Sequence, residues 1–379
     1  MKIVIAPDSF KESLSAQDVA QAIAAGIRDV LPDAEIACVP MADGGEGTLD
    51  AVLAATQGVR HRIEVRDALL RPRQAHWGWL PQSKAFIEMA EAAGLEHIAP
   101  PDRDPAIADT YGVGQLMIAA LDAGASTIVL TAGGSATNDA GAGMLRACGM
   151  RFLDSDGLEL PPGGLALAKL AQIDAQGLDP RFKSLRLIIA TDVNNPLCGP
   201  RGASATFGPQ KGATPALVQA LDNSLGRFAD LSAQNLGHDF RDSPGAGAAG
   251  GLGFAAIAWL GATVQPGAEL VAQTVGLEQT LSFADLVFTG EGRMDEQTLH
   301  GKTPMAVVNL AKKREIPVIA LVGGLGTGYQ ALHAAGLTAA FSLVDSPMNL
   351  STACQRAPEL LRDRAAQIMR VWLAGSGRS

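Results

Sequence analysis

The chain has 379 residues, 47% of them hydrophobic and 18% charged, which is enough apolar material for more than one core. Its formal net charge of −9 opposes binding to nucleic acid and to anionic membranes. No apolar run reaches membrane-spanning length, and the start KIVIAPDSF lacks the charged and apolar regions of a secretory signal. We therefore expect a cytoplasmic protein of two domains, without a nucleic-acid or membrane partner.

The four cysteines stand far apart in the sequence, without the short spacing of metal ligands, at Cys38, Cys148, Cys198 and Cys354. In a reducing cytosol, cysteines of this kind are usually buried free thiols. We therefore expect no disulfide framework and no zinc site.

Two strand–helix units open the chain. Residues 2–6 (KIVIA) are expected to form a strand, and a helix follows from Ser15, which offers an N-cap. Residues 35–40 form the second expected strand, followed by a helix over 47–58 that ends at a glycine. Strands that alternate with helices in this way are typical of parallel α/β sheets.

The middle of the chain differs in its pattern. Residues 61–80 alternate with period two and carry Trp77 and Trp79, which predicts a β-hairpin. A strand, a glycine-rich loop and a helix follow over 126–149, and a further strand over 185–193. The middle therefore predicts an α/β region with an antiparallel addition.

Three more strands are expected near the C-terminus, at 285–290, 317–324 and 338–345, with helices between them. Together with the first two strands they would form one doubly wound parallel sheet. This predicts a domain made of residues 1–60 and 281–379, interrupted by an inserted α/β domain of residues 61–280. A simple division into an N-terminal and a C-terminal half is the alternative.

Charged and polar residues follow several of these strands, at the sheet edge where open α/β sheets bind ligands. They are Asp8, Ser9 and Lys11 after the first strand, Asp43 after the second, and Glu291 and Arg293 after the strand at 285–290. For any single carboxylate the alternative is helix capping. Several of them in one crevice, beside basic side chains, predict a polar site that handles charge.

A glycine-rich loop follows the strand near residue 130. It contains Gly133, Gly134, Ser135, Thr137, Asn138 and Asp139. Glycines allow backbone N–H groups to approach a phosphate, and a following helix N-terminus adds positive potential. The loop is therefore a candidate for binding nucleotide phosphates, and a tight turn capped by Asn or Asp is the alternative.

Two further segments place single polar residues in stiff turns. Asp192 lies at the end of the strand expected at 185–193, in the stretch TDVNNP, where it suits a metal ion or a substrate hydroxyl. An Asx-turn before Pro196 is the alternative. Lys211 lies in FGPQKG, where it could meet a carboxylate or a phosphate, or remain solvated.

Two motif matches lack their structural context. Gly245–Gly250 satisfies the dinucleotide glycine pattern, but HDFRDSP before it is no hydrophobic strand. Gly301, Lys302 and Thr303 look like the end of a P-loop, but Glu296 stands where the first glycine should be. Lys302 nevertheless stays a candidate for binding an anion.

Seven blocks of the sequence resemble the type I glycerate kinases, in that family's order and over nearly the whole chain. The blocks are APDSFKESLSA (6–16), PMADGGEGT (40–48), GGSATNDAGAG (133–143), TDVNNPLCGPRGAS (191–204), FGPQKGA (207–213), GAAGGLG (247–253) and TGEGRMDEQTLHGKTP (289–304). One departure is Glu12, where the family usually has glycine. The resemblance implies transfer of a phosphoryl group from ATP to D-glycerate, usually giving 2-phosphoglycerate, with Mg²⁺. It also implies a flavodoxin-like domain interrupted by a second α/β domain.

Phosphoryl transfer requires cations on the phosphates and a group that takes the proton of the hydroxyl. The candidate cations are Lys11, Lys211, Arg293 and Lys302, and Asp192 is the first candidate for base or metal ligand, ahead of Asp43 and Glu291. We expect Asp192 and Glu291 as the metal ligands. Asp8, Ser9, Lys211 and Arg293 are expected to bind the substrate, and Gly133–Asp139 with Lys302 the nucleotide.

Three alternatives stay open. A nicotinamide-dependent hydroxyacid dehydrogenase would use the glycines at 245–250, and a solute-binding protein would share the two-domain form but normally requires an export signal. Within the kinase hypothesis, phosphorylation of the 3-hydroxyl of D-glycerate is the alternative to the 2-hydroxyl. The sequence also leaves open a homo-oligomer.

Overall fold

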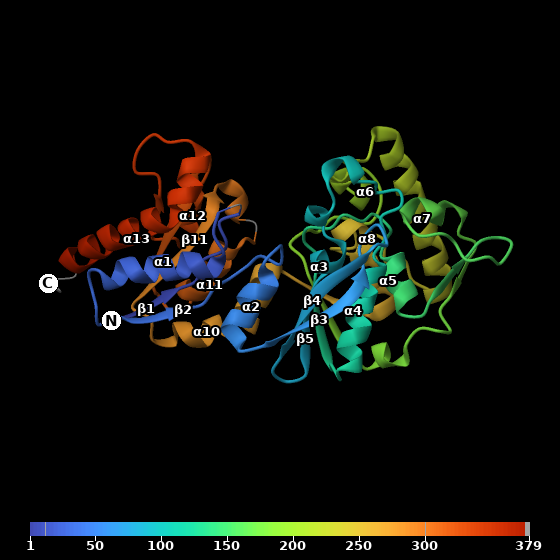
Figure 1. Cartoon of the computed structure of the whole chain (residues 1–379), viewed down its shortest axis with the longest axis horizontal. Coiled ribbons are helices and arrows are strands. Elements are labelled where there is room, and N and C mark those ends of the chain that lie inside the picture. Colours follow the sequence, from blue (N-terminus) through green and yellow to red (C-terminus); the bar gives the residue numbers. More distant parts are fainter. Residues whose placement is uncertain (12, 300, 376–379) are drawn as a thin grey trace. The chain divides into compact units, whose positions relative to one another are not determined.

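The computed structural model describes residues 1–11, 13–299 and 301–375 (Figure 1), so Glu12, the departure from the family pattern, lies outside the described residues. The chain groups into two compact units. The first consists of Met1–Asp43, Asp50–Gln57 and Pro266–Ser379, and the second of Gly44–Leu49 and Gly58–Gln265. Residues 266–280, predicted to belong to the inserted domain, group with the first unit, and independent domains with the predicted limits stay a prediction.

The first unit is built on a parallel five-stranded sheet. Its strands are β1 (Lys2–Ile5), β2 (Glu35–Cys38), β11 (Leu286–Met294), β12 (Val318–Leu325) and β13 (Ala339–Ser342). The spatial order is β13-β12-β11-β1-β2, with Ile3 beside both Ile36 and Leu286. Numbered along the chain within this unit, that is the flavodoxin-like order 2-1-3-4-5. The predicted doubly wound sheet is therefore confirmed, and its topological switch point lies between β1 and β11.

Helices cover both faces of this sheet. The helices of this unit are α1 (Ala16–Arg28), α9 (Gly267–Thr274), α10 (Leu277–Thr280), α11 (Thr303–Lys312), α12 (Ala331–Ala335) and α13 (Leu350–Gly375), with 3₁₀ turns at Leu281–Phe283 and Glu296–Leu299. The first two residues of α2 (Thr48–Thr56) group with the second unit and the rest of it with the first. The long C-terminal helix α13 packs against α1 (Figure 1). Gly26 permits this contact, because a Cβ there would lie 2.0 Å from the Arg362 carbonyl oxygen. Ser15 caps α1 as predicted, and its Oγ accepts a hydrogen bond from the Asp18 N–H.

The second unit is built on a six-stranded mixed sheet in the order β10-β9-β6-β5-β4-β3. The strands are β3 (Val59–Arg66), β4 (Pro72–Leu80), β5 (Lys84–Glu88), β6 (Thr127–Thr131), β9 (Arg186–Ala190) and β10 (Thr263–Gln265); β7 (Arg151–Leu153) and β8 (Gln172–Asp174) form a separate pair. The pairing of β3 with β4 is antiparallel, with His61 opposite Trp77, which confirms the predicted hairpin. The pairs from β5 through β6 and β9 to β10 are parallel.

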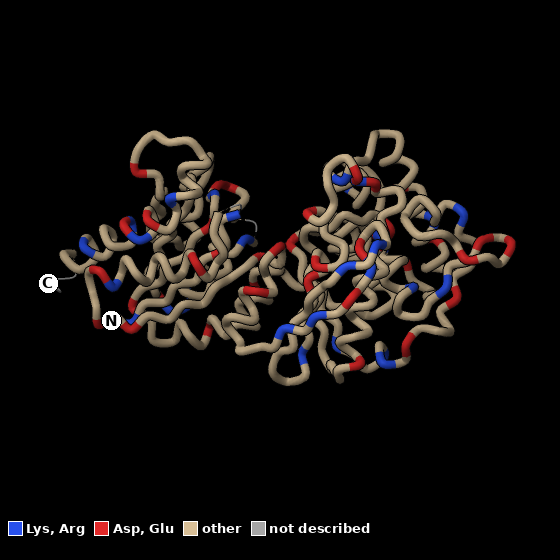
Figure 2. Tube along the Cα trace, in the orientation of Figure 1, with Lys and Arg blue, Asp and Glu red and all other residues tan. Residues whose placement is uncertain are grey.

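The helices of the second unit are α3 (Met89–Ala93), α4 (Tyr111–Asp122), α5 (Ala142–Ala147), α6 (Ala203–Phe207), α7 (Pro215–Leu236) and α8 (Ala248–Leu260). Short 3₁₀ turns lie at Leu95–His97, Pro100–Asp102, Gly164–Lys169, Pro180–Lys183 and Pro209–Lys211. In the described residues, no helix combines the length and the apolarity required to cross a membrane. Figure 2 shows acidic and basic residues interspersed along both units.

The glycines at 245–250 serve backbone packing. Gly250 has a φ of +69°, and a Cβ on it would lie 1.9 Å from the Thr137 carbonyl oxygen. Its own carbonyl oxygen accepts a hydrogen bond from the Ala140 N–H. These glycines therefore bring the start of α8 against the 133–139 loop, and this contact explains the pattern that resembled a dinucleotide motif.

Candidate active site

Asp8 lies directly beyond β1, at the switch point of the first unit. Its Oδ2 accepts a hydrogen bond of 2.6 Å from the Thr303 Oγ1, and its Oδ1 accepts one of 2.7 Å from the Ser9 N–H. Burial, together with the nearby charge of Asp43, raises the pKa of Asp8 to about 6. Asp8 thus carries a carboxyl group that changes protonation close to neutral pH.

Glu291 is a buried carboxylate at the same edge, whereas Asp8 is half-buried. Its Oε1 accepts a hydrogen bond of 2.7 Å from the Thr298 Oγ1, and its Oε2 lies 3.7 Å from the Lys302 Nζ. Burial raises the pKa of Glu291 to about 7, although Thr298 and Lys302 act in the opposite direction. A carboxylate with this pKa suits general base catalysis near neutral pH.

The sequence correctly placed Asp8, Asp43 and Glu291 at one edge of the sheet, because Asp8 and Asp43 follow β1 and β2 and Glu291 lies in the second half of the neighbouring strand β11. The predicted end of this strand at residue 290 was wrong, since β11 continues to Met294 and contains both Glu291 and Arg293. The continued pairing with β12, with Arg293 opposite Gly324, accounts for the extension. We call Asp8, Asp43, Glu291, Thr298, Lys302 and Thr303 the carboxylate cluster.

Lys11 and Arg293 lie near this cluster. Both side chains are exposed, and the charge of Lys11 lowers the pKa of Asp8, which shows that the two are close. The Arg293 Nε lies 3.5 Å from the Asp295 Oδ2, and 74% of its side chain is exposed. Two cations that can be reached from solvent at a strand edge suit the binding of phosphate groups.

The glycine-rich loop belongs to the second unit, and a buried lysine side chain, Lys211, is hydrogen-bonded to it. Lys211 is 1% exposed, and its Nζ donates hydrogen bonds of 2.8 Å to the Ser135 Oγ and 2.6 Å to the Thr137 carbonyl oxygen. Burial lowers the pKa of Lys211 to about 7. This geometry gives Lys211 a role in positioning the loop, and a direct contact with substrate stays a prediction.

Asp139 organises the end of the loop. Its carboxylate accepts hydrogen bonds from the Thr110 N–H and Oγ1 and from the N–H groups of Gly141 and Gly143, at 2.8–3.1 Å. Asn138 donates one of 2.8 Å to the Ser204 Oγ. The predicted order of strand, loop and helix over 126–149 is confirmed, with α5 beginning at Ala142. Phosphate binding by Gly133, Gly134, Ser135, Thr137, Asn138 and Asp139 stays a prediction, and the side chains of the last three are fully buried in this structure.

Asp192 lies beyond β9, and its side chain is exposed. It belongs to the second unit and Glu291 to the first, so the metal pair predicted from them is not formed within either unit. Over the residues that the structure describes, no group of three or more His, Cys, Asp or Glu side chains is arranged to hold a metal ion. The assignment of Asp192 as base or metal ligand stays a prediction.

Several residues of these sites were missed in the sequence. Thr298 and Thr303 hold the carboxylates of the first unit, and Thr110 and Ser204 hold the loop of the second. Glu88, at the end of β5, accepts hydrogen bonds of 3.0 Å from the N–H groups of Gly47 and Leu49. Its position at a strand end was a usable signal. The sequence around the threonines gives no such signal, because their role depends on contacts between segments that are distant in the sequence.

Comparison with known proteins identifies the family. A family model described as the glycerate kinase family matches residues 3–373. The glycerate kinase of Bacillus subtilis (strain 168) is 48% identical, over 97% of this chain and 98% of the relative. The glycerate 2-kinase of Escherichia coli (strain K12) is 48% identical, over 94% of both chains.

A solved structure agrees with these relatives. The crystal structure of a protein assigned as glycerate kinase 2 from Salmonella typhimurium LT2 matches with a TM-score of 0.90 and 46% identity, over 100% of this chain and 99% of the other. Both sequence and fold therefore agree over nearly the full length. The chain belongs to the glycerate kinase family.

Proposed function

We propose that the protein transfers the γ-phosphoryl group of ATP to the 2-hydroxyl of D-glycerate, giving ADP and 2-phospho-D-glycerate, an organic acid phosphorylation. Membership in the glycerate kinase family supports the reaction, and the name of the Escherichia coli relative supports the 2-position. The observation that carries the site is a pair of carboxyl groups with raised pKa values, half-buried Asp8 and buried Glu291, at the switch point of a flavodoxin-like sheet.

Glu291 is the proposed general base, in place of Asp192, which was the first candidate from the sequence. It removes the proton of the glycerate hydroxyl, whose oxygen then forms a bond to the γ-phosphorus. The bond from this phosphorus to the β–γ bridging oxygen breaks, and the electron pair leaves with ADP. Lys302, 3.7 Å from Glu291, stabilises the carboxylate before the proton moves.

The carboxylate cluster also fits Mg²⁺. In kinases this ion is usually held by one or two carboxylates and by the phosphates of the nucleotide, so a complete protein cage is not required. The negative charge of Asp43 raises the pKa of Asp8, and a cation beside the two carboxylates would reduce this repulsion. Asp8 and Asp43 would hold Mg²⁺, which neutralises phosphate charge when it is bound. Lys11 and Arg293 are the proposed contacts to the phosphates.

A cytoplasmic location is part of the proposal. The reaction consumes ATP, and all four cysteines are free in the structure, as expected in a reducing compartment.

The test is product analysis of a reaction with MgATP and D-glycerate. We expect stoichiometric ADP and, by phosphorus NMR, phosphate on carbon 2. Phosphate on carbon 3 would overturn the position of transfer and leave the kinase intact, and turnover of NAD(H) without turnover of ATP would overturn both.

A further inference from the structure

A cavity of about 480 Å³ lies within the first unit, beside the carboxyl ends of β11 and β12. Strand residues Gly292, Gly323 and Gly324 line one side, and Leu350, Ala353 and Cys354 of α13 line another. Its volume lies in the range of about 300–1,000 Å³ that is typical of small-molecule sites. The carboxyl edge of an open α/β sheet is also where such ligands bind.

The chemistry of the lining changes from apolar to cationic. Phe10, Leu343 and Leu360 give apolar walls, whereas Lys11 and Arg293 bring positive charge. Lys11 is close enough to Asp8 to lower its pKa, so the charged part of the lining adjoins the carboxylate cluster. A ligand that matches this lining has a flat apolar ring, which contacts the apolar walls, joined to an anionic chain, which contacts the two cations.

The glycine at 324 leaves room that a side chain would occupy. A Cβ built on Gly324 meets no described atom within 4 Å, and its φ lies outside the left-handed region. The backbone conformation at this position therefore does not require glycine. The absence of a side chain instead leaves open the space that a ligand in the cavity would need. Because the last registered pair of β12 and β13 is Val322 with Ser342, the peptide groups of Gly324 lie beyond that ladder.

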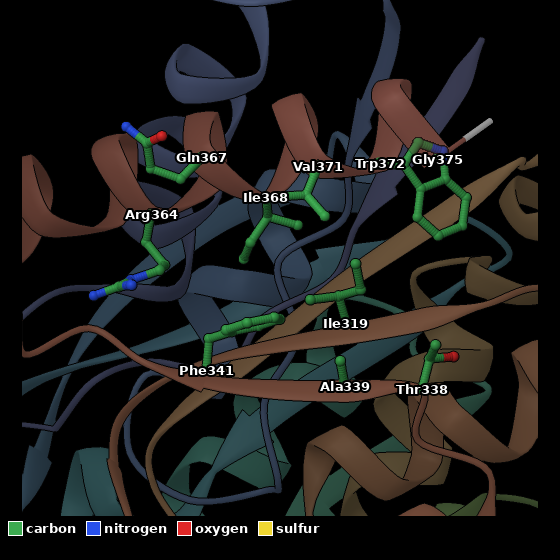
Figure 3. A pocket seen from close by; sticks show the side chains of 10 residues that line it. All are labelled: Ile319, Thr338, Ala339, Phe341, Arg364, Gln367, Ile368, Val371, Trp372 and Gly375. Carbon is green, nitrogen blue, oxygen red and sulfur yellow. The ribbon is translucent and has the colours of Figure 1, made fainter. Parts of the chain in front are cut away.

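A second cavity of the first unit provides a contrast. It has a volume of about 580 Å³ and lies between β13 and α13, where Phe341 and Val371 line it (Figure 3). It also contacts Ile319 and Thr338, near the starts of β12 and β13, so it lies at the amino ends of the strands. Arg364 alone among its lining residues carries a charge. This larger cavity therefore lies at the wrong end of the strands for a nucleotide site, and it has one cation in its lining where the cavity at Gly324 has two.

We propose that the cavity at Gly324 binds the adenine and ribose of ATP, and that Lys11 and Arg293 direct the phosphates toward Asp8 and Glu291. This proposal rests on the proposed function, because it takes ATP to be the phosphoryl donor. It assigns the base of the nucleotide to the first unit and is independent of the phosphate role predicted for Gly133–Asp139.

Cys354 gives a test on the unaltered protein. Its thiol lines the cavity and is half-buried, whereas Cys38, Cys148 and Cys198 are not among the lining residues. Alkylation by N-ethylmaleimide, measured by mass spectrometry at each cysteine, should slow at Cys354 at least fivefold with saturating ADP. Inorganic pyrophosphate, which lacks the base, and D-glycerate should leave the rate unchanged. Protection by D-glycerate instead of ADP, or no protection by ADP, overturns the proposal.

A substitution that fills the cavity provides the second test. Gly324→Val should raise the KM for ATP and the Kd for ADP about tenfold or more, with the KM for D-glycerate nearly unchanged. Gly375→Val is the matched control, because Gly375 also has open space around its Cβ position but lines the other cavity. A rise in the KM for D-glycerate alone would overturn the proposal and leave the kinase intact. An unaltered protein that does not phosphorylate D-glycerate, yet shows ADP protection at Cys354, would overturn the function and leave the site intact.

Discussion

The Oγ1 of Thr303 donates a hydrogen bond of 2.6 Å to the Oδ2 of Asp8, across a separation of 295 residues in the sequence. Thr303 is the first residue of α11, and Asp8 follows β1. The bond therefore joins the two ends of the discontinuous first unit at the switch point of its sheet. It also stabilises the ionised form of Asp8, since it lowers a pKa that burial raises.

The substitution Thr303→Val should move the pKa of Asp8 further above about 6, because the bond that favours the carboxylate is lost. If Asp8 must be ionised to hold Mg²⁺, the acidic limb of the kcat/KM profile shifts to higher pH, and the Mg²⁺ concentration for half-maximal rate rises. Both are measured in steady-state assays between pH 5 and 9. Thr289→Val is the control, because Thr289 is a buried threonine that bonds to the Ala6 carbonyl oxygen instead. An unshifted limb in Thr303→Val would show that Asp8 does not control the rate.

Glu291→Gln tests the general base. Loss of a positioned base should lower kcat by about 10²-fold or more, with a small change in KM. In the unaltered protein the rate should rise with pH through about 7, where Glu291 loses its proton. Exposed Glu64 provides the matched control in Glu64→Gln, which should leave kcat unchanged. Near-normal kcat in Glu291→Gln would return the role of base to Asp192.

The same carboxyl group predicts an effect on stability. The pKa of Glu291 is about 7 in the folded protein and 4.5 in the unfolded chain, so the folded state holds the extra proton between these values. The free energy of unfolding should therefore fall as pH rises from 4.5 to 7, by on the order of 3 kcal/mol at most. Glu291→Gln removes this loss, and we expect a higher thermal midpoint than in the unaltered protein at pH 8. An equal or lower thermal midpoint in Glu291→Gln would contradict the prediction that the ionised, buried Glu291 destabilises the folded protein at pH 8.

The sheet edge could be predicted from the sequence because strand ends are local signals. Each of KIVIA, EIACVP and DLVFTG is followed within three residues by a carboxylate, and parallel pairing then brings Asp8, Asp43 and Glu291 together. Burial could not be predicted in the same way. The sequence predicted that Lys211 meets an anion or remains solvated, but its side chain is fully buried and its Nζ bonds to Ser135 and Thr137 of the 133–139 loop.

Lys211→Met tests whether burial lowers the pKa of this lysine. The pKa of Lys211 is about 7 in the folded protein and 10.5 in the unfolded chain, so the unfolded state holds more protons between these values. The lysine should therefore make the free energy of unfolding increase with pH above 7. Thermal midpoints at pH 6.5 and 9 should show this contribution in the unaltered protein and in the control Lys169→Met, and should lack it in Lys211→Met. A midpoint difference between Lys211→Met and the control that does not change with pH would contradict the shifted pKa.

Gly250→Ala tests the contact between the glycine turn and the loop. A Cβ at this position would lie 1.9 Å from the Thr137 carbonyl oxygen, which also accepts the bond from Lys211, so the backbone of the loop must move. The φ of +69° adds a strain of about 1–2 kcal/mol. Gly157→Ala separates the two effects, because Gly157 has a φ of +78° but no atom within 4 Å of its Cβ position. We expect a small fall in thermal midpoint for Gly157→Ala, and for Gly250→Ala a larger fall with faster hydrogen exchange over 133–143. Equal falls in the two variants would show that the close approach does not constrain the loop.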